Sequence, residues 1–258
     1  MRSIILLSAL FSLAACAEFT PSQTADTPVE PPTMTMDEPT LKDISTSLES
    51  VLAAQPEAVQ ARYPFRNPAQ TLDFFGIESG MTVVEALPGG GWYSKILLPY
   101  LGEEGELIGA NYSIDMQRLF SFRTPEQLKK LETWTTDWPE TAATWVEGNN
   151  TPISGFFFGA QPESMAGSAD AVLFIRALHN FARFQNEGNF LTTAIKDAYT
   201  ALKPGGILGV VQHQMREESP DAWAEGNRGY LKQSFVVAQM EAVGFVFEGA
   251  SDINANPK

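Results

Sequence analysis

The stretch TVVEALPGGGWYSK, residues 82–95, carries the clearest signal for the fold of this 258-residue chain. A short apolar run ends in Glu85, a proline and three glycines follow, and a helix-like segment comes next. The apolar run is typical of a buried strand, and glycines are typical of a tight turn or of backbone that approaches a ligand. This order of strand, glycine turn and helix predicts the opening unit of an α/β fold.

Strands and helices alternate outward from this stretch. Strands are predicted at residues 81–87, 105–112, 143–148, 170–178, 207–213 and 245–249. Helices are predicted at residues 41–53, 68–76, 92–102, 125–132, 189–206 and 229–245. Such alternation predicts a three-layer, doubly wound and mostly parallel sheet covered by helices on both faces.

The first residues predict a separate processing signal. Arg2 precedes a 12-residue apolar run, which is too short to span a bilayer and ends with small residues before Cys16, the only cysteine. This order resembles a bacterial lipoprotein signal, with residues 1–15 removed and Cys16 lipidated. It implies a chain anchored by lipid at the periplasmic face of the cell envelope, more readily at the outer membrane. A plain secretory signal with an incidental Cys16 is the alternative.

The rest of the chain divides into a tether and one domain. Residues 16–40 are rich in proline, threonine and acidic residues and predict a disordered tether, whereas residues 41–258 predict the folded domain. The formal net charge is −14, with 17 basic and 31 acidic residues. This balance argues against a nucleic-acid partner, because nucleic-acid phosphates attract lysine and arginine.

The glycine turn alone does not identify a ligand. It lacks the Gly-Lys-Ser/Thr of a Walker loop and does not meet the Gly-x-Gly-x-x-Gly dinucleotide fingerprint. In a doubly wound sheet, however, ligands bind beyond the carboxyl ends of the strands, near the switch point. The turn is therefore either a cofactor cradle formed by Gly89, Gly90 and Gly91, or only a connection between a strand and a helix.

The chain resembles class I S-adenosylmethionine-dependent methyltransferases over residues 60–250. Their first motif, an acid followed by alternating glycines, is matched by Glu85, Gly89 and Gly91. Similar later segments are ADAVLFIRALHNF at residues 169–181, ALKPGGILGVVQH at 201–213 and EAVGFVFEG at 241–249. The chain is most similar to exported predicted methyltransferases that carry PGGGWY and Arg-x-x-His-Asn. The resemblance implies S-adenosylmethionine as cofactor and a small or envelope-associated methyl acceptor.

Three departures from the family pattern stand out. Leu87 replaces the first glycine of the motif. The second strand ends at Asn111 instead of the acid that usually holds the ribose hydroxyls, and Asp115 comes four residues later. Asn111 can still bond hydroxyls, without the assistance of a charge. The last, antiparallel strand of the family fold is expected to be missing, since residues 251–258 have no strand pattern.

The two histidines are the candidate proton acceptors. His179 and His213 follow neighbouring predicted strands, so both are expected over the same crevice as Glu85. A histidine pKa near 6.5 suits removal of a proton from an acceptor hydroxyl or amine. Two alternatives remain open: ordinary structural histidines, or a metal site with Glu85, for which no compact ligand spacing exists.

Other residues are assigned to the same crevice, and each of the first three has two possible interpretations. Arg176 ends an apolar strand and either pairs with Glu85 or clamps a substrate carboxylate. Trp92 and Tyr93 follow the glycines and either pack the helix on the sheet or stack on adenine. Asn149 follows the predicted third strand and could reach the cofactor base.

Two functions follow from these observations. The first is methyl transfer, with Glu85, Gly89, Gly90, Gly91, Asn111 and Asn149 at the cofactor and Arg176, His179 and His213 at the acceptor. The second is a non-catalytic binding module on the same fold, because export would remove the domain from the cytoplasmic source of S-adenosylmethionine. A metal-assisted hydrolase is a weaker third hypothesis.

Overall fold

A seven-stranded parallel sheet forms the centre of the molecule. The computed structural model describes residues 1–7 and 47–255. Within them the strand order is β4-β3-β2-β5-β6-β1-β9, and all neighbouring pairs are parallel. The strands are β1 (Arg2–Leu7), β2 (Thr82–Ala86), β3 (Glu106–Asn111), β4 (Ile153–Phe157), β5 (Ala169–Ile175), β6 (Leu202–Val211) and β9 (Phe245–Ser251). A second, two-stranded sheet pairs β7 (His213–Met215) with β8 (Tyr230–Lys232).

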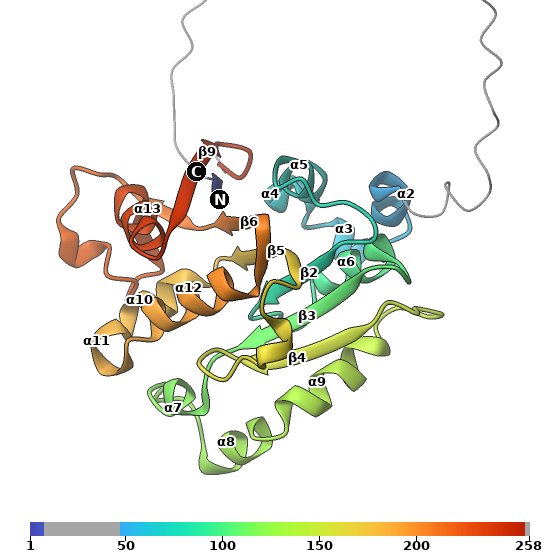
Figure 1. The fold of residues 1–258 in the computed structure, drawn as a ribbon, viewed down its shortest axis with the longest axis horizontal. Coiled ribbons are helices and arrows are strands. Elements are labelled where there is room, and N and C mark those ends of the chain that lie inside the picture. The colour runs from blue at the N-terminus through green and yellow to red at the C-terminus, as the bar shows by residue number, and fades with distance from the viewer. Residues whose placement is uncertain (8–46, 256–258) are drawn as a thin grey trace, which may run out of the picture.

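Helices cover both faces of the sheet, as Figure 1 shows. One buried core contains side chains of α10, α12 and α13, and a second contains side chains of α2, α5, α6 and α9. The helices are α2 (Leu48–Ala53), α3 (Glu57–Gln60), α4 (Tyr63–Arg66), α5 (Pro68–Phe74), α6 (Ser94–Leu101), α7 (Ile114–Gln117), α8 (Pro125–Leu131), α9 (Trp134–Ala143), α10 (Leu178–Arg183), α11 (Gln185–Gly188), α12 (Phe190–Ala201) and α13 (Gln233–Glu241). The predicted three-layer α/β fold is confirmed.

The strand order reverses between β2 and β5. From β2 the chain winds through β3 to β4 on one side, and from β5 through β6 toward β9 on the other. β2 and β5 are neighbours, with Ala86 level with Phe174. Connections that leave in opposite directions open a crevice at the carboxyl ends of such a strand pair. The segment after β2 is the glycine turn, and the segment after β5 begins at Arg176.

The predicted third strand at residues 143–148 is wrong. The α9 helix runs to Ala143, and the strand that pairs with β3 is β4, at Ile153–Phe157. The β-branched and aromatic residues at 144–146 have strand propensity, but Trp145 instead packs against Gly91. Two glycines around β4, at 155 and 159, concealed its strand pattern.

Other predicted boundaries also differ, and β6 begins at Leu202, inside the predicted helix at residues 189–206. The predicted helix at residues 229–245 is shorter, since Tyr230–Lys232 forms β8 before α13 begins. His213 lies on β7 instead of ending the fifth predicted strand, because β6 stops at Val211.

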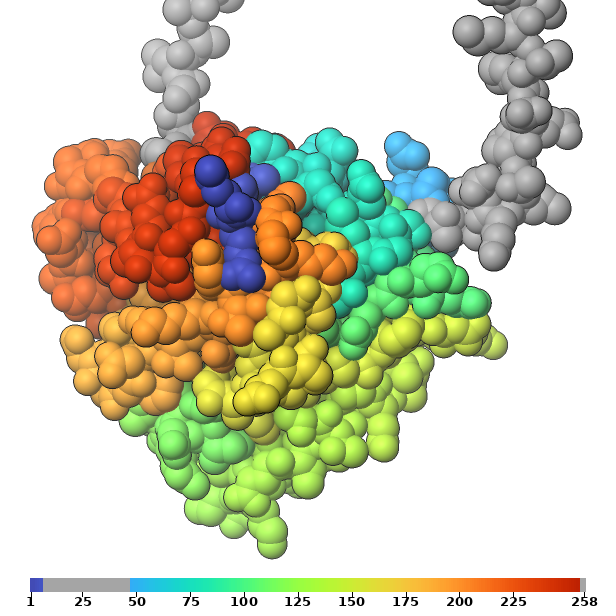
Figure 2. All heavy atoms as spheres, viewed as in Figure 1, coloured from blue at the N-terminus to red at the C-terminus, as the bar shows by residue number. Residues whose placement is uncertain are grey.

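The β1 strand occupies the position where the family fold would place its last strand. Figure 2 shows it, in blue, between the orange and red segments of β6 and β9. It is parallel to both neighbours, so no antiparallel strand occurs in the sheet that the structure describes. Ile4 and Leu6 are buried in the core. The edge of β6 is therefore paired, in contrast to the open edge that a missing strand would leave.

The predicted signal peptide overlaps β1. Residues 2–7 form the strand, whereas residues 8–15, Cys16 and the tether lie outside the described residues. Cleavage before Cys16 would remove β1 from the sheet. The signal peptide and the lipidation of Cys16 stay predictions.

Candidate functional site

The glycine turn after β2 presents open backbone. Gly89 and Gly90 are exposed, and a Cβ placed on Gly90 would meet no atom within 4 Å. Gly91 is buried at φ +74°, and a Cβ there would lie only 2.1 Å from the indole ring of Trp145. One side of the turn is thus packed on the protein, and the other side is free for a ligand to approach.

Leu87 takes the backbone conformation of the glycine that it replaces. Its φ is +57°, in the left-handed region that favours glycine, and its N–H donates to the carbonyl of Ala110 at 2.7 Å. Arg176, directly after β5, also lies in this region at φ +56°, and its N–H donates to the carbonyl of Val211 at 2.6 Å. Both strands at the switch point therefore end in a strained non-glycine residue, a feature that clusters at functional sites.

Glu85 is a buried acid beneath the turn. It is 4% exposed, and the Ser94 hydroxyl at the start of α6 donates to its Oε2 at 2.6 Å. Burial raises the pKa of Glu85 to about 7, although the Ser94 bond and the charge of Arg66 act in the opposite direction. Glu85 therefore titrates near neutral pH, and it can accept a hydrogen bond from a cationic ligand above the turn.

Arg176 does not form the predicted pair with Glu85. Arg176 is exposed, and no hydrogen bond or ion pair joins these two side chains in the described structure. The left-handed backbone of Arg176 turns the chain out of the sheet, while the Glu85 carboxyl bonds to Ser94. Arg176 instead lies close enough to His179 and His213 to lower the pKa of each through its positive charge.

Arg66 is the cation that faces Glu85. Its guanidinium carbon lies 4.3 Å from the centre of the Trp92 ring. Burial lowers the pKa of Arg66 to about 10, and the positive charge of Arg176 adds to this shift. Trp92 thus stacks on an arginine in this structure, and Tyr93 packs in the core, 3% exposed. The packing interpretation of Tyr93 is confirmed.

His179 lies in the first turn of α10 beside Gln212. Burial lowers the pKa of His179, and the neighbouring Gln212 side chain offsets part of this shift. Gln212 is held by donation from its Nε2 to the carbonyl of Gly229 at 2.7 Å. Its Oε1 and the Nδ1 of His179 are both buried and complete no hydrogen bond. A proton on Nδ1 would satisfy both atoms and leave Nε2 of His179 as the proton acceptor.

His213 lies on β7, opposite Tyr230 of β8. The two ring centres are 5.7 Å apart, and His213 is exposed to solvent. Partial desolvation and the charge of Arg176 lower the pKa of His213. Both histidines therefore lie near Arg176, and the lowered pKa of each favours its neutral form.

Asn111 ends β3 but uses its carbonyl oxygen locally. Its Oδ1 accepts hydrogen bonds from the Tyr112 N–H at 2.8 Å and from Nε2 of Gln117 at 3.4 Å. The adjacent Tyr112 hydroxyl accepts a bond from Nδ2 of Asn180 at 2.8 Å. The ends of β3 and α10 are tied together in this way. Asn111 can offer only its Nδ2 to a ligand hydroxyl.

Asn149 does not join the crevice. It precedes β4 and donates to the Thr151 carbonyl at 3.4 Å, and its neighbour Asn150 bonds Glu103 beyond the end of α6. These contacts place Asn149 at the amino-terminal end of β4, whereas the glycine turn follows the carboxyl end of β2. The prediction depended on a strand at residues 143–148, and that strand does not exist.

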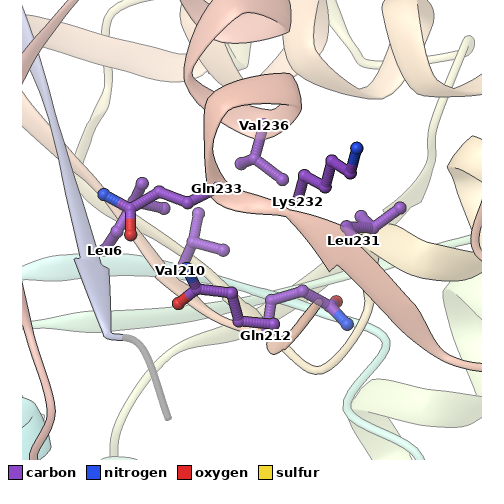
Figure 3. A pocket seen from close by; sticks show the side chains of 8 residues that line it. Leu6, Val210, Gln212, Leu231, Lys232, Gln233 and Val236 are labelled. Atoms are coloured by element: carbon purple, nitrogen blue, oxygen red, sulfur yellow. The ribbon is translucent and has the colours of Figure 1, made fainter. Parts of the chain in front are cut away.

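A small cavity lies beside the crevice, at the carboxyl end of β6. Its volume is about 20 Å³, enough for a single water. Figure 3 shows its lining by Leu6 of β1, Val210 and Gln212 near the end of β6, and residues of β8 and α13. The cavity is too small for a cofactor, and it contacts the same Gln212 that adjoins His179.

The described residues provide no evident metal centre. No three histidine, cysteine, aspartate or glutamate side chains among residues 1–7 and 47–255 are grouped to hold a metal ion. Over the same residues, no helix is long and apolar enough to cross a membrane.

Arg66, Ser94 and Gln212 belong to this site, and sequence analysis missed all three. Arg66 precedes the motif by 19 residues and has no spacing signal of its own. Ser94 lies nine residues after Glu85, where only the start of a helix was predicted. Gln212 adjoins His213 in the sequence, and that proximity was the one available signal.

This chain has structural likenesses among known proteins at low sequence identity. No family model matches it, and no curated protein matches it. Similar solved structures include an S-adenosylmethionine-dependent methyltransferase from Aquifex aeolicus, with 16% identity, a TM-score of 0.48, and coverage of 77% of this chain and 88% of that chain. Another is the putative methyltransferase in complex with the Haloferax volcanii Trm112 activator, with 15% identity, a TM-score of 0.45, and coverage of 77% and 76%. Likeness at this level says nothing about the activity of this chain.

Proposed function

We propose that this chain is a methyltransferase that uses S-adenosylmethionine, acting on a small or envelope-associated acceptor. The observation that carries the proposal is the convergence at the switch point. Glu85 and the open backbone of Gly89 and Gly90 lie on the β2 side, and Arg176 and His179 lie on the β5 side. The order of motifs in the sequence supports the same function.

The residues of the β2 side fit the cofactor. A buried acid beneath open glycine backbone suits the ammonium group and the close approach of a nucleoside amino acid. Leu87 keeps the left-handed backbone, so the departure from glycine leaves the path of the turn intact. Asn111 fits less well, because its Oδ1 is already bonded. S-adenosylmethionine would supply an electrophilic methyl group here.

The residues of the β5 side suit the acceptor. The lowered pKa of His179 and of His213 favours the neutral imidazole, which can take the proton that an acceptor hydroxyl or amine loses. A hydrogen bond from Nδ1 of His179 to Oε1 of Gln212 would leave Nε2 of His179 as the free acceptor atom. The protein would otherwise act by holding the two reactants in line.

Calorimetric titration of S-adenosylhomocysteine into the full chain tests the proposal. Gly90→Val should abolish micromolar binding, because it fills the open side of the turn at a position with no steric clash and no positive φ. Gly249→Val is the matched control, since Gly249 on β9 also has open space and no positive φ. Absence of binding to the wild type, with folding confirmed by circular dichroism, would refute cofactor use and leave the binding-module hypothesis.

We also propose that the chain is anchored by lipid at the cell envelope through Cys16. The support is the order of Arg2, the apolar run, the small residues and the cysteine. Mass spectrometry of the protein purified from bacterial membranes, with Cys16→Ser as control, tests this. A full-length, unlipidated chain would overturn it.

A further inference from the structure

Three arginines gather at the mouth of the crevice without carboxylate partners. Arg62 and Arg66 are one helical turn apart, and the charges of Arg62 and Arg176 both act on Arg66. None of the three forms an ion pair in the described parts of the chain, where the paired cations are Arg118, Lys203 and Lys232. This cluster is notable in a protein whose net charge is −14.

The geometry of the strands brings these cations together. Arg176 follows β5 directly, and the ladder between β5 and β2 ends at Phe174 and Ala86, so Arg176 and the glycine turn both follow the carboxyl ends of these neighbouring strands. Trp92, two residues beyond the middle glycine, carries the guanidinium of Arg66 on its ring at 4.3 Å. Stacking on an indole restricts a guanidinium to a plane, so its donors are oriented before a ligand arrives.

Glu85 is the acid whose charge acts on Arg66, but it leaves most of the positive charge of the three arginines uncompensated. Its carboxyl is buried and accepts from the Ser94 hydroxyl. On the other side of Arg176 lie His179 and His213, which carry no negative charge in either protonation state. Like charges held close together are costly unless an anion is present for part of the functional cycle.

We propose that Arg66 and Arg176 form an anion subsite that binds a carboxylate or phosphate group of the methyl acceptor. The inference rests on the proposed methyltransferase function and specifies its substrate class. Guanidinium groups bind such anions through paired, charge-assisted N–H donors. Arg176 adjoins both histidines, so an acceptor held there presents its neighbouring hydroxyl or amine to a proton acceptor.

Titration of inorganic phosphate and of malonate into the full chain, at constant ionic strength, tests the subsite. We expect saturable binding that weakens at least tenfold in Arg66→Gln and in Arg176→Gln. Arg118→Gln should bind as the wild type does, because this exposed arginine already pairs with Asp115 at 2.7 Å. Arg66→Gln could weaken binding by disturbing the fold, because Arg66 is half-buried. Arg176→Gln is free of this ambiguity, because Arg176 is exposed. Tighter binding of one anion identifies the acceptor as a phosphate ester or a carboxylic acid.

Saturation with S-adenosylhomocysteine separates this inference from the proposed function. Phosphate binding that persists beside the bound nucleoside supports an acceptor subsite. Competition between the two would overturn it, because the arginines would then hold the amino-acid carboxylate of the cofactor. Anion binding that survives both arginine substitutions would also overturn it. If S-adenosylhomocysteine fails to bind while phosphate still binds at the arginines, methyl transfer fails as the function and the anion site stands.

Discussion

Replacing Glu85 by glutamine measures the electrostatic cost of the buried acid. Burial raises the pKa of Glu85 from 4.5 to about 7 in the folded protein, against the effects of Ser94 and Arg66. One pKa unit corresponds to 1.36 kcal/mol, so the shift amounts to about 3 kcal/mol of folding free energy. Glutamine keeps the shape of the side chain and can still accept the Ser94 hydroxyl, but it carries no charge at any pH.

The direction of the effect follows from proton binding. Between pH 4.5 and about 7 the unfolded chain loses the Glu85 proton while the folded protein keeps it. The stabilisation from this group is therefore complete below pH 4.5 and disappears as pH rises through 7. The wild type should lose about 3 kcal/mol of unfolding free energy between pH 4.5 and pH 8 through Glu85, and Glu85→Gln should not. The difference between variant and wild type should therefore shift by about 3 kcal/mol in favour of the variant over this range.

Urea unfolding followed by tryptophan fluorescence at pH 4.5, 6, 7 and 8 provides the measurement. Both proteins contain His179 and His213, so the contribution of the histidines cancels in the difference. Glu104→Gln, on an exposed turn, controls for loss of a surface charge. A difference between Glu85→Gln and the wild type that does not change with pH would refute the assignment of Glu85 as a desolvated acid.

Three further predictions concern the strained turn, the first strand and the histidine pair. Leu87→Gly should be more stable than Leu87→Ala by about 1 kcal/mol in urea unfolding, because only glycine adopts φ +57° freely; equal stability would contradict a strained Leu87. In the uncleaved chain, expressed without export, Ile4→Asp should destabilise the fold by at least about 3 kcal/mol, because Ile4 is fully buried in β1; no effect would show that β1 does not contribute to the fold. Gln212→Leu should lower the pKa of His179 in an NMR titration and leave His213 as the internal control; a pKa of His179 equal to that of the wild type would contradict the positioning role.

Local patterns predicted most of the sheet. Near-continuous apolar runs marked β2, β5 and β6, because strands buried on both faces exclude polar residues. Glycine and proline stops marked the ends of helices such as α6, which Gly102 terminates at φ +70°. These signals depend on neighbours in the sequence, so no knowledge of packing was needed.

Predictions failed where packing decided between two local possibilities. The segment at residues 143–148 has strand propensity, but Trp145 fills the space above Gly91, and β4 lies farther along the chain. The apolar run after Arg2 suits a signal peptide and a buried strand equally well. In the structure its first residues pair with β6 and β9, which lie some 200 residues away in the sequence.

The sequence by itself determined the α/β class and the position of the glycine turn, and it predicted Glu85, Arg176 and the two histidines as crevice residues. Each follows from periodicity or from a motif a few residues long. Only the tertiary structure decided the partners: Ser94 for Glu85, Trp92 for Arg66 and Gln212 for His179. Partner choice depends on which strand ends and helix starts meet above the sheet. That arrangement results from the packing of the whole chain, which no local pattern contains.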